Sequence, residues 1–433
     1  MKKPHELRTR LIHGQFKSKK WDYNHHVVPP MSASATFRLD GSSRGADGFF
    51  RFACDRINPD REVPIYIYDR LDEPTRGMLE ENLAQAEGAE AGVAFSTGMA
   101  AISAALGVLC AQGDEIVAHR VLYGCTYSLM VNWLPRLGVK TTFVDLNDLD
   151  AVKAALTPRT RAVYCESPVN PHLELVDLAP LRALLEQHEG IGSPVDEVAA
   201  GAKRPALVVD NTFATPWGQR PLELGADVVV HSLTKGIGGF GTDMGGVVLC
   251  KEPMRNLLLM YRKDFGGALS SRAAWSFLVH GLPTLASRME TSQRSAQTVA
   301  EWLEAHPKVT RVVYPGLASF PQAELARKQM TDPQGRFAPG MMIYFEIDDP
   351  AKDGERGARM MDHIAEHAYA ITLAVSLGQV KSLIEHPYSM THSALPVAEK
   401  HKGGLHPGGV RLSVGLEDPK DLIADLSEAL ERA

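Results

Sequence analysis

The stretch Asp227-Val-Val-Val-His-Ser-Leu-Thr-Lys235 runs directly into a glycine-rich segment, Gly236-Ile-Gly-Gly-Phe-Gly241. The apolar run predicts a buried strand, and the glycines after it predict a tight loop. A lysine at this junction would be partly desolvated, and burial lowers the pKa of an amine. A neutral amine can form a Schiff base with an aldehyde. An exposed lysine without a chemical role would show the same short pattern, so the rest of the chain has to distinguish the two.

Short apolar runs alternate with helical patterns along most of the chain. The runs predict strands at 91–95, 115–118, 141–144, 162–165, 206–210 and 226–230, and residues 75–86 and 100–110 are examples of the helical stretches. Continuously apolar strands that alternate with helices are typical of an α/β fold with a mostly parallel sheet and helices on both faces.

The chain divides into three predicted parts. Residues 1–65 contain scattered Pro and Gly and predict an irregular N-terminal arm. Residues 66–290 form the predicted large α/β domain, in which 190–205 is interpreted as a surface insertion. Residues 291–433 form a smaller C-terminal α+β domain, with strands expected at 341–346 and 409–414 and a closing helix at 421–432.

Composition excludes several classes of protein. The chain has 433 residues, 44% of them hydrophobic, and a formal net charge of -6, so nothing favours nucleic acid or an anionic membrane as a partner. No apolar run is long enough to span a bilayer, and the N-terminus lacks the apolar core of a signal peptide. The five cysteines form no C-x-x-C pair, so neither a disulfide framework nor a zinc site is indicated. These features predict a soluble cytoplasmic protein without a metal.

Asp210 ends the predicted strand before the one that leads to Lys235. Ligands of parallel sheets bind at the carboxyl ends of the strands, so the two side chains are expected close together. There, a carboxylate can hold the ring N–H of pyridoxal phosphate, although a helix-capping aspartate has the same appearance. Ser96-Thr-Gly98-Met99 joins a strand to a helix whose N–H groups favour a phosphate, and Ser232 and Thr234 can add hydroxyl groups.

Two further side chains have functional interpretations. Tyr123 follows a predicted strand, where its ring can stack on a cofactor and its phenol can move protons; the alternative is a core tyrosine. Arg411 is a charge inside an apolar strand, and buried arginine is rare unless it is paired. A substrate carboxylate, bound in a bidentate manner, is one suitable partner.

Two motifs are discounted. Gly236–Gly241 matches G-x-G-x-x-G, but a predicted strand follows it, whereas a dinucleotide-binding motif opens a helix. His363-Ile-Ala-Glu-His367 matches a metal-binding pattern, but no third ligand is evident, and we interpret it as a solvated helix face.

Taken together, these residues resemble the Cys/Met metabolism (transsulfuration) family of PLP-dependent enzymes, from about residue 25 to the end of the chain. The resemblance implies the fold-type I PLP-dependent transferase fold. It also implies a homo-oligomer, expected to be a homotetramer built of two active-site-sharing dimers. The implied roles are the neighbour's phosphate clamp (Tyr68, Arg70), the phosphate turn (Gly98, Met99), the stacking tyrosine (Tyr123), the ring-nitrogen aspartate (Asp210), the Schiff-base lysine (Lys235) and the substrate-carboxylate site (Ser376, Arg411). Glu73 stands where the family usually has asparagine.

Two segments resemble the methionine γ-lyases of this family, namely Tyr123-Gly-Cys125-Thr and Lys263-Asp264. They imply α,γ-elimination of L-methionine, or of a related sulfur amino acid, to a thiol, ammonia and 2-oxobutanoate, with Cys125 in the catalytic site. The alternatives are γ-replacement, as in a cystathionine γ-synthase or O-acylhomoserine sulfhydrylase, a fold-type I aminotransferase, and a PLP-binding protein without activity. The chain departs from the family pattern at Gln379-Val-Lys381 and in the insertions at 41–64 and 190–205.

Overall fold

Two sheets organise the part of the chain that the computed structural model describes, which comprises residues 5–14, 26–53, 65–188, 190, 204–390 and 405–433. The larger sheet has seven strands in the order β1-β7-β6-β5-β4-β2-β3, and the smaller has five in the order β10-β11-β12-β9-β8. In the larger sheet β7 runs antiparallel to both neighbours, and every other pair is parallel. The predicted α/β fold with a mostly parallel sheet is therefore confirmed.

The predicted strands of both sheets are found within about two residues of their expected ends. The described strands are β1 (Ala91–Phe95), β2 (Glu115–His119), β3 (Lys140–Val144), β4 (Thr160–Glu166), β5 (Ala206–Asp210), β6 (Val228–Ser232), β7 (Gly246–Cys250), β8 (Val309–Val313), β9 (Met342–Ile347), β10 (Ile371–Leu373), β11 (Ser382–Glu385) and β12 (Gly409–Ser413). Strands β8, β10 and β11 were not predicted from the sequence.

Helices surround both sheets. They are α1 (Leu7–His13), α2 (Ser42–Ala53), α3 (Pro74–Glu87), α4 (Gly98–Leu109), α5 (Gly124–Ser128), α6 (Leu149–Ala155), α7 (Leu178–Glu186), α8 (Thr215–Gly218), α9 (Glu252–Phe265), α10 (Ser271–Ser276), α11 (Leu282–Glu304), α12 (Ala323–Gln329), α13 (Glu355–His367) and α15 (Pro419–Arg432), with π turns η1 (Leu129–Trp133) and η4 (Phe277–Gly281) and 3₁₀ turns η2 (Leu134–Leu137) and η3 (Pro221–Leu224). Within the described residues, none of these helices has the length and apolar character of a bilayer span.

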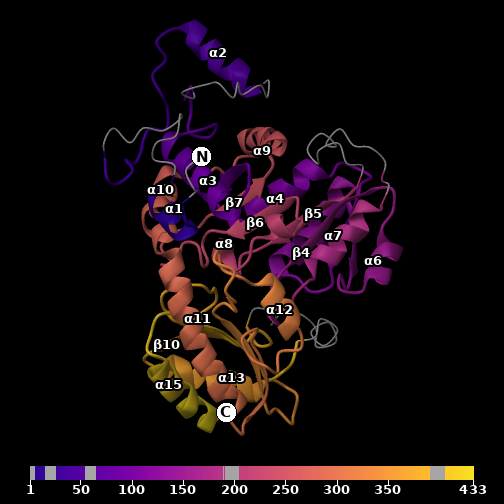
Figure 1. Cartoon of the computed structure of the whole chain (residues 1–433), viewed down its shortest axis with the longest axis vertical. Helices are drawn as coiled ribbons and strands as arrows, with labels where there is room; N and C mark the ends of the chain where they lie inside the picture. The colour runs from indigo at the N-terminus through magenta and orange to yellow at the C-terminus, as the bar shows by residue number, and fades with distance from the viewer. Residues whose placement is uncertain (1–4, 15–25, 54–64, 189, 191–203, 391–404) are drawn as a thin grey trace.

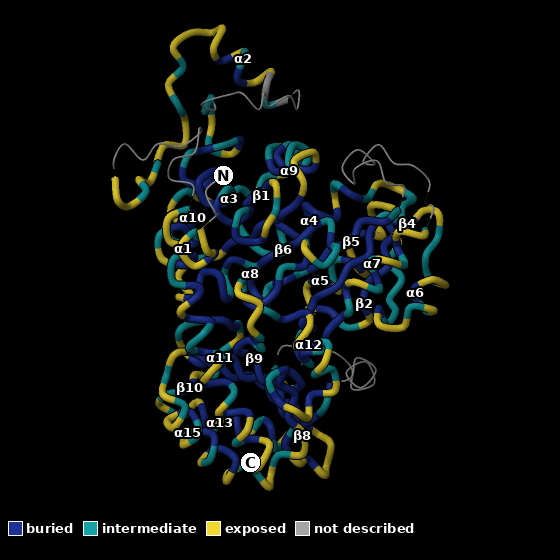
Figure 2. Tube along the Cα trace, in the orientation of Figure 1, coloured by how far each residue is buried: buried dark blue, intermediate teal, exposed yellow. Residues whose placement is uncertain are grey.

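Alternate residues of the central strands pack into separate hydrophobic cores on the two faces of the larger sheet. In β5, Leu207 and Val209 belong to the core that includes α1, α3 and α7, whereas Val208 belongs to the core beneath α4 and α9. The two-residue period of a strand produces this division, and coverage on both faces explains why these strands are apolar throughout. Figure 2 shows the buried strands in dark blue with exposed segments around them.

The two sheets lie in different halves of the molecule. In Figure 1 the larger sheet lies in the upper half, the orange and yellow C-terminal part lies below it, and α11 runs between them. The smaller sheet has a core of its own, closed by α13 and α15. The predicted domain boundary between residues 290 and 291 falls inside α11. The division of the chain into domains at residues 65 and 290 stays a prediction.

The prediction of an irregular arm over residues 1–65 is wrong for two segments. Leu7 and Leu11 are spaced by one helical turn and are buried, and they form α1. In α2, Gly48 allows close packing rather than breaking the helix, since a Cβ there would lie 2.8 Å from Ile67 Cδ1. Helix α2 lies at the top of Figure 1, away from both sheets. The rest of the two predicted insertions, 54–64 and 191–203, lies outside the described residues.

A buried ion pair fastens α9 to α3 and β1. Arg262 is fully buried, and its Nη1 lies 2.6 Å from Glu80 Oε1. Arg262 also donates to Ala94 O at 2.9 Å and to Leu71 O at 3.0 Å, while Glu80 Oε1 accepts from Ala94 N at 2.8 Å. The pair therefore joins α9 to two consecutive elements, α3 and β1, that lie far from it in the sequence.

We predict that Glu80→Ala destabilises the fold by about 3–5 kcal/mol, because it leaves the Arg262 guanidinium buried without its counter-ion. Denaturant unfolding followed by circular dichroism measures the effect. Glu355→Ala is the matched control, since Glu355 forms only an exposed pair with Arg359, and its loss should change stability by less than about 0.5 kcal/mol. Equal, small shifts for both variants would show that the buried pair contributes nothing specific.

Candidate active site

Three polar side chains end neighbouring strands on one face of the larger sheet. Glu166 and Asp210 are register partners at the ends of β4 and β5, and Ser232 ends the adjacent strand β6. Each follows a residue two positions earlier that packs beneath α4, and strand alternation therefore directs all three toward that face. The carboxyl ends of parallel strands thus bring the predicted Asp210 and Ser232 together.

Lys235 lies in the turn that follows β6 and points to the smaller sheet. Its Nζ donates to Ser376 Oγ at 2.7 Å. Burial lowers the pKa of the Lys235 amine, and the nearby positive charge of Arg411 lowers it further. A lowered pKa favours the neutral amine, which is the nucleophilic form.

The loop that carries Ser376 packs against the backbone of the lysine turn. Ser376 has φ +92°, a conformation that a non-glycine residue rarely adopts. Gly378 has φ +75°, and a Cβ at this position would lie 2.8 Å from Gly236 Cα. A hydrogen bond from Val380 N to Gly239 O, 2.8 Å long, joins the same two segments. Glycine at 378 is therefore required for the two loops to meet.

Arg411, in β12, reaches the same point from the smaller sheet. The residue is 6% exposed. Its Nη1 donates to Asn170 Oδ1 at 3.0 Å, its Nη2 donates to Ser376 O at 2.9 Å, and Glu385 Oε1 lies 3.1 Å from Nη1. The predicted pair of Ser376 and Arg411 is thus in direct contact, and Asn170 and Glu385 join it without having been predicted.

Asp210 and Glu166 are two carboxyl groups in adjacent positions. Burial raises the pKa of Asp210, while hydrogen bonds from Thr212, one of them from its backbone N at 2.9 Å, oppose that shift. Burial and the charge of Asp210 raise the pKa of Glu166 to about 8. Glu166 also accepts a hydrogen bond from Tyr123 N at 2.6 Å. Sequence reasoning missed Glu166, although its position at the end of a predicted strand, 162–165, was the available signal.

Tyr123 lies at the N-cap position of α5, and 45% of its surface is exposed. A hydrogen bond with the Cys125 side chain, together with burial, raises the pKa of Tyr123 to about 12. The phenol is therefore protonated at neutral pH and can act as an acid. Cys125 lies in the first turn of α5 and is exposed.

The start of α4 forms the phosphate end of the predicted site. Thr97 caps the helix, since its Oγ1 accepts from Ala100 N at 3.0 Å, which leaves the amides of Gly98 and Met99 for an outside acceptor. A Cβ at Gly98 would lie 2.9 Å from Ser232 Cβ, so the helix end and Ser232 are in close contact.

Thr234, also predicted to contact the cofactor, has local partners. Its Oγ1 accepts from Gly245 N at 3.1 Å and lies 3.4 Å from Gly245 O. These contacts fasten the lysine turn to the segment that enters β7. The Gly236–Gly241 motif therefore leads into a strand, as expected for a loop that is not a dinucleotide site.

Arg288, in α11, supports the lysine turn and was also missed. It donates to Gly236 O at 2.6 Å, Ile237 O at 2.9 Å and Gly281 O at 2.8 Å. Burial lowers the pKa of this guanidinium to about 10. Its Nε also donates to Thr284 Oγ1 at 2.9 Å. Because the carbonyls of Gly236 and Ile237 belong to the turn, Arg288 fixes the path of the chain after Lys235.

Tyr68 and Arg70 are not part of this cluster in a single chain. Both are exposed, the guanidinium of Arg70 lies 5.6 Å from the centre of the Tyr68 ring, and Arg70 Nη1 donates to the carbonyl of Lys263. Glu73 caps α3 by accepting from the backbone N of Thr75 at 2.9 Å and from that of Arg76.

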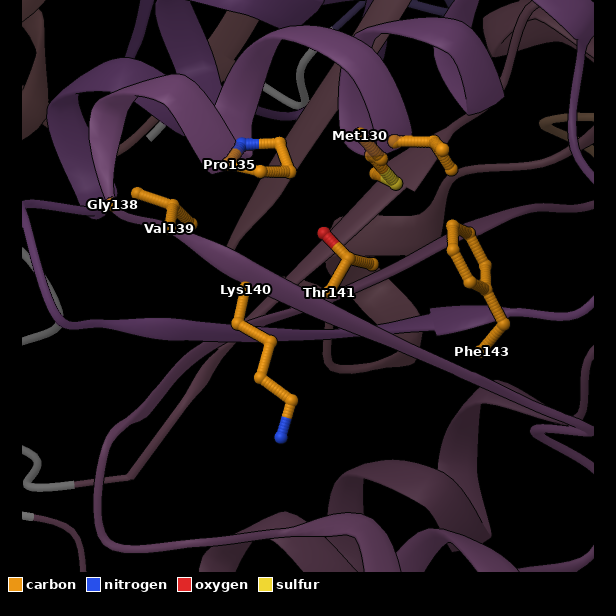
Figure 3. A pocket seen from close by; sticks show the side chains of 8 residues that line it. Met130, Pro135, Gly138, Val139, Lys140, Thr141 and Phe143 are labelled. Atoms are coloured by element: carbon orange, nitrogen blue, oxygen red, sulfur yellow. The ribbon is translucent and has the colours of Figure 1, made fainter.

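An apolar cavity of about 400 Å³ lies at the β3 edge of the larger sheet, away from Lys235. Figure 3 shows Met130 and Pro135 on one side of it, Thr141 and Phe143 on the other, and the amine of Lys140 directed away. No titratable group converges on this cavity from the residues that line it. The cluster at the strand ends, formed by Glu166, Asp210, Ser232, Lys235 and Arg411, is therefore the stronger candidate for a catalytic site.

The described residues contain one group with the spacing of a metal site, formed by His119, Asp145 and Glu174. His119 Nδ1 accepts from Leu146 N at 3.2 Å, so Nε2 carries the ring proton and cannot act as a ligand. Arg120 bonds both carboxylates, at 3.1 and 2.9 Å. The group is therefore better explained as a charge cluster.

A family model described as Cys/Met metabolism PLP-dependent enzyme matches residues 8–431. The chain belongs to this family. An L-methionine γ-lyase from Porphyromonas gingivalis is 41% identical over 98% of this chain and 96% of that protein. A cystathionine β-lyase from Lactococcus lactis is 35% identical over 98% of this chain and 99% of that protein. The crystal structure of cystathionine γ-lyase from Lactobacillus plantarum complexed with L-serine has a TM-score of 0.81 and 33% identity, covering 99% of both chains.

Membership of the Cys/Met metabolism family confirms the fold-type I architecture and the cofactor, pyridoxal phosphate. The chemistry of the strand-end groups fits this cofactor. A pyridinium N–H would stabilise the ionised form of Asp210, whose pKa burial raises. Lys235 offers an amine of lowered pKa, and the free amides of Gly98 and Met99 suit a phosphate.

We predict that Lys235 is the residue that carries the cofactor, because its amine has a lowered pKa and lies at the strand ends. Borohydride reduction of the holoenzyme, followed by peptide mapping, should find the pyridoxyl group on Lys235. Lys263, on α9, is the internal comparison, since its Nζ pairs with Asp264 at 3.0 Å. A label on Lys263 or on any other lysine would show that the site is wrongly assigned.

Proposed function

We propose that the protein catalyses α,γ-elimination of L-methionine, or of a closely related sulfur amino acid, and releases a thiol, ammonia and 2-oxobutanoate. The observation that carries this proposal is the convergence of an amine, a guanidinium and a phenol, from Lys235, Arg411 and Tyr123, at the strand ends. The L-methionine γ-lyase that covers nearly the whole chain supports it, and the relatives reported above are all carbon–sulfur lyases by name.

Substrate binding in this proposal depends on the smaller sheet. Arg411 and Ser376 hold the α-carboxylate, since the guanidinium has been brought to the site by its bonds to Asn170 and Ser376. The Lys235 amine then faces the α-carbon from the turn after β6. Held orientation of this kind removes much of the entropy cost of reaching the transition state.

Pyridoxal phosphate supplies an electron sink that stabilises negative charge at the substrate α-carbon. Asp210 maintains this property by binding the ring N–H. Lys235 takes the proton from Cα and, once it has released this proton, takes a second one from Cβ, so that the electrons left at Cβ form a double bond to Cγ as the Cγ–S bond breaks. The lowered pKa of its amine suits Lys235 to both transfers. Tyr123 donates a proton to the departing sulfur, because a thiolate is a poor leaving group.

Replacement at the γ-carbon is the alternative function and uses the same residues. In replacement a thiol completes the reaction, whereas in elimination water does. The reported β-lyase and γ-lyase relatives favour elimination over replacement as the first reaction to test. An aminotransferase would release no thiol.

The proposal includes an assembly and a location. Tyr68 and Arg70 lie exposed in a single chain. We propose that they bind the cofactor phosphate of the neighbouring subunit in a dimer that shares its active sites, and that two of these dimers form a homotetramer. We propose the cytoplasm as the location. The cysteines at 110, 125, 165 and 250 are unpaired, which supports a reducing compartment.

We predict that the wild-type enzyme converts methionine to methanethiol, ammonia and 2-oxobutanoate in equal amounts, measured by mass spectrometry and thiol titration. Tyr123→Phe keeps the ring but removes the proton, so it should slow methionine cleavage by about 10²–10⁴-fold. O-acetylhomoserine, whose carboxylate leaves readily, serves as the matched substrate and should be slowed much less. If the wild type releases no thiol but joins O-acetylhomoserine to sulfide, the replacement reading is correct.

We predict that the active site is shared between subunits. Arg70→Ala and Lys235→Ala chains should each be inactive alone. An equimolar mixture of the two chains should recover about a quarter of wild-type activity, since half of its dimers are hybrids and each hybrid keeps one of two sites. Native mass spectrometry verifies the hybrids, and absence of recovery in verified hybrids would mean that each chain builds its own site.

A further inference from the structure

Glu385 is a buried carboxylate that is bonded to the guanidinium proposed to receive the substrate. It is the register partner of Arg411 across β11 and β12, and its Oε1 lies 3.1 Å from Arg411 Nη1. Glu385 is 2% exposed, and among the described residues its Oε2 has no hydrogen-bond partner. An unpaired buried oxygen is costly, so the position calls for an explanation beyond packing.

The charges around Glu385 come from several elements. Burial raises the pKa of Glu385, while the positive charges of Arg411 and Lys235 lower it. Tyr123 interacts with Arg411 from α5, and its pKa of about 12 keeps it neutral in the physiological range. His386, the next residue along the chain, is bonded to Ser389 Oγ and Pro407 O.

We propose that Glu385 competes with the substrate for Arg411 and takes up a proton when the substrate α-carboxylate binds, and that it thereby sets the strength and pH dependence of substrate binding. The proposal rests on the proposed function in one respect, namely that Arg411 holds the substrate carboxylate. It makes Glu385 a positioning and specificity-determining residue that acts through Arg411.

The physical reason is the number of charges that one buried guanidinium can neutralise. In the free site, Arg411 and Glu385 balance each other. A substrate carboxylate adds a second negative charge, and two carboxylates that share a site cannot both stay ionised without a large rise in the pKa of one. Arg411 is the only cation bonded to Glu385 among the described residues, since the second carboxylate oxygen, Oε2, has no hydrogen-bond partner there. The proton is therefore taken up at Glu385.

The sign of the pH effect follows from linkage. Binding raises the pKa of Glu385, so the complex holds more protons than the free enzyme. Affinity is constant at pH values below the free-site pKa and falls as the pH rises between the free-site and bound-site values. It is constant again above the bound-site value. The total loss is about tenfold for each unit by which binding raises the pKa.

The effect is the same for substrate and product, because 2-oxobutanoate carries the same carboxylate as methionine. An interaction that weakens both equally changes KM and product inhibition and leaves kcat unchanged. Glu385 would then limit product retention rather than speed the chemical steps.

The test measures proton uptake by the holoenzyme with 4-(methylsulfanyl)butanoate, which is methionine without its amine and therefore cannot react. Titration calorimetry in buffers of different ionisation enthalpy counts the protons at several values between about pH 6 and pH 9. We expect the wild type to take up as much as one proton. Glu385→Gln keeps an oxygen for Arg411 but no charge, so it should take up none and bind the probe more tightly at high pH. It should also lower the KM for methionine and the inhibition constant of 2-oxobutanoate together, with kcat within about twofold.

Two controls separate the possible failures. Glu166→Gln is the same chemical change at another buried carboxyl near the site and should leave proton uptake in place. Arg411→Ala should abolish probe binding; unchanged affinity in that variant would overturn the carboxylate assignment in the proposed function. Three outcomes would overturn the role of Glu385 while leaving the proposed function intact. In the first, the wild type takes up no proton; in the second, Glu385→Gln still takes one up with a change in the cofactor spectrum; in the third, Glu166→Gln loses the uptake. Absence of proton uptake in the wild type overturns the role of Glu385 even if Glu385→Gln fails to fold.

Discussion

The contact between the lysine turn and the loop at Ser376 is the constraint on which the rest of the structure depends. The two segments approach so closely that only glycine fits at 378, and Lys235 Nζ donates to Ser376 Oγ across the junction. Because the turn belongs to the larger sheet and the loop to the smaller, this contact fixes how the two sheets meet. Arg411 reaches the strand ends only in that arrangement.

Buried arginines maintain the arrangement by three different kinds of bonding. Arg288 binds backbone carbonyls around the turn and the hydroxyl group of Thr284, Arg262 pairs with Glu80 of α3, and Arg411 combines a carboxylate, an amide oxygen and a carbonyl. The planar guanidinium has five N–H donors, which lets one side chain join several segments at once. The shape of the site is therefore set by donors placed behind it as well as by the groups that face it.

Much of the fold and the main site could be predicted from the sequence, because strands covered on both faces form continuous apolar runs and the polar residues that end them are visible. Asp210 and Lys235 were found in this way. Glu166 and Glu385 were not, since their importance depends on partners in neighbouring strands, which a linear pattern does not encode. Arg288 was missed for the same reason, and α1 was missed because a helix of seven residues gives almost no periodic signal.

The separation in sequence between Asn170 and Arg411 has a consequence for how the protein matures. These two residues are 241 positions apart, and Lys235 and Ser376 are 141 apart. Contacts of such long range form late in folding, after the local elements have assembled. A chain still being synthesised exposes Lys235 before the residues that orient it exist. The reactive amine thus gains its selectivity only when the last strand, β12, is in place, so a nascent or truncated chain has no means of choosing among the amino acids around it.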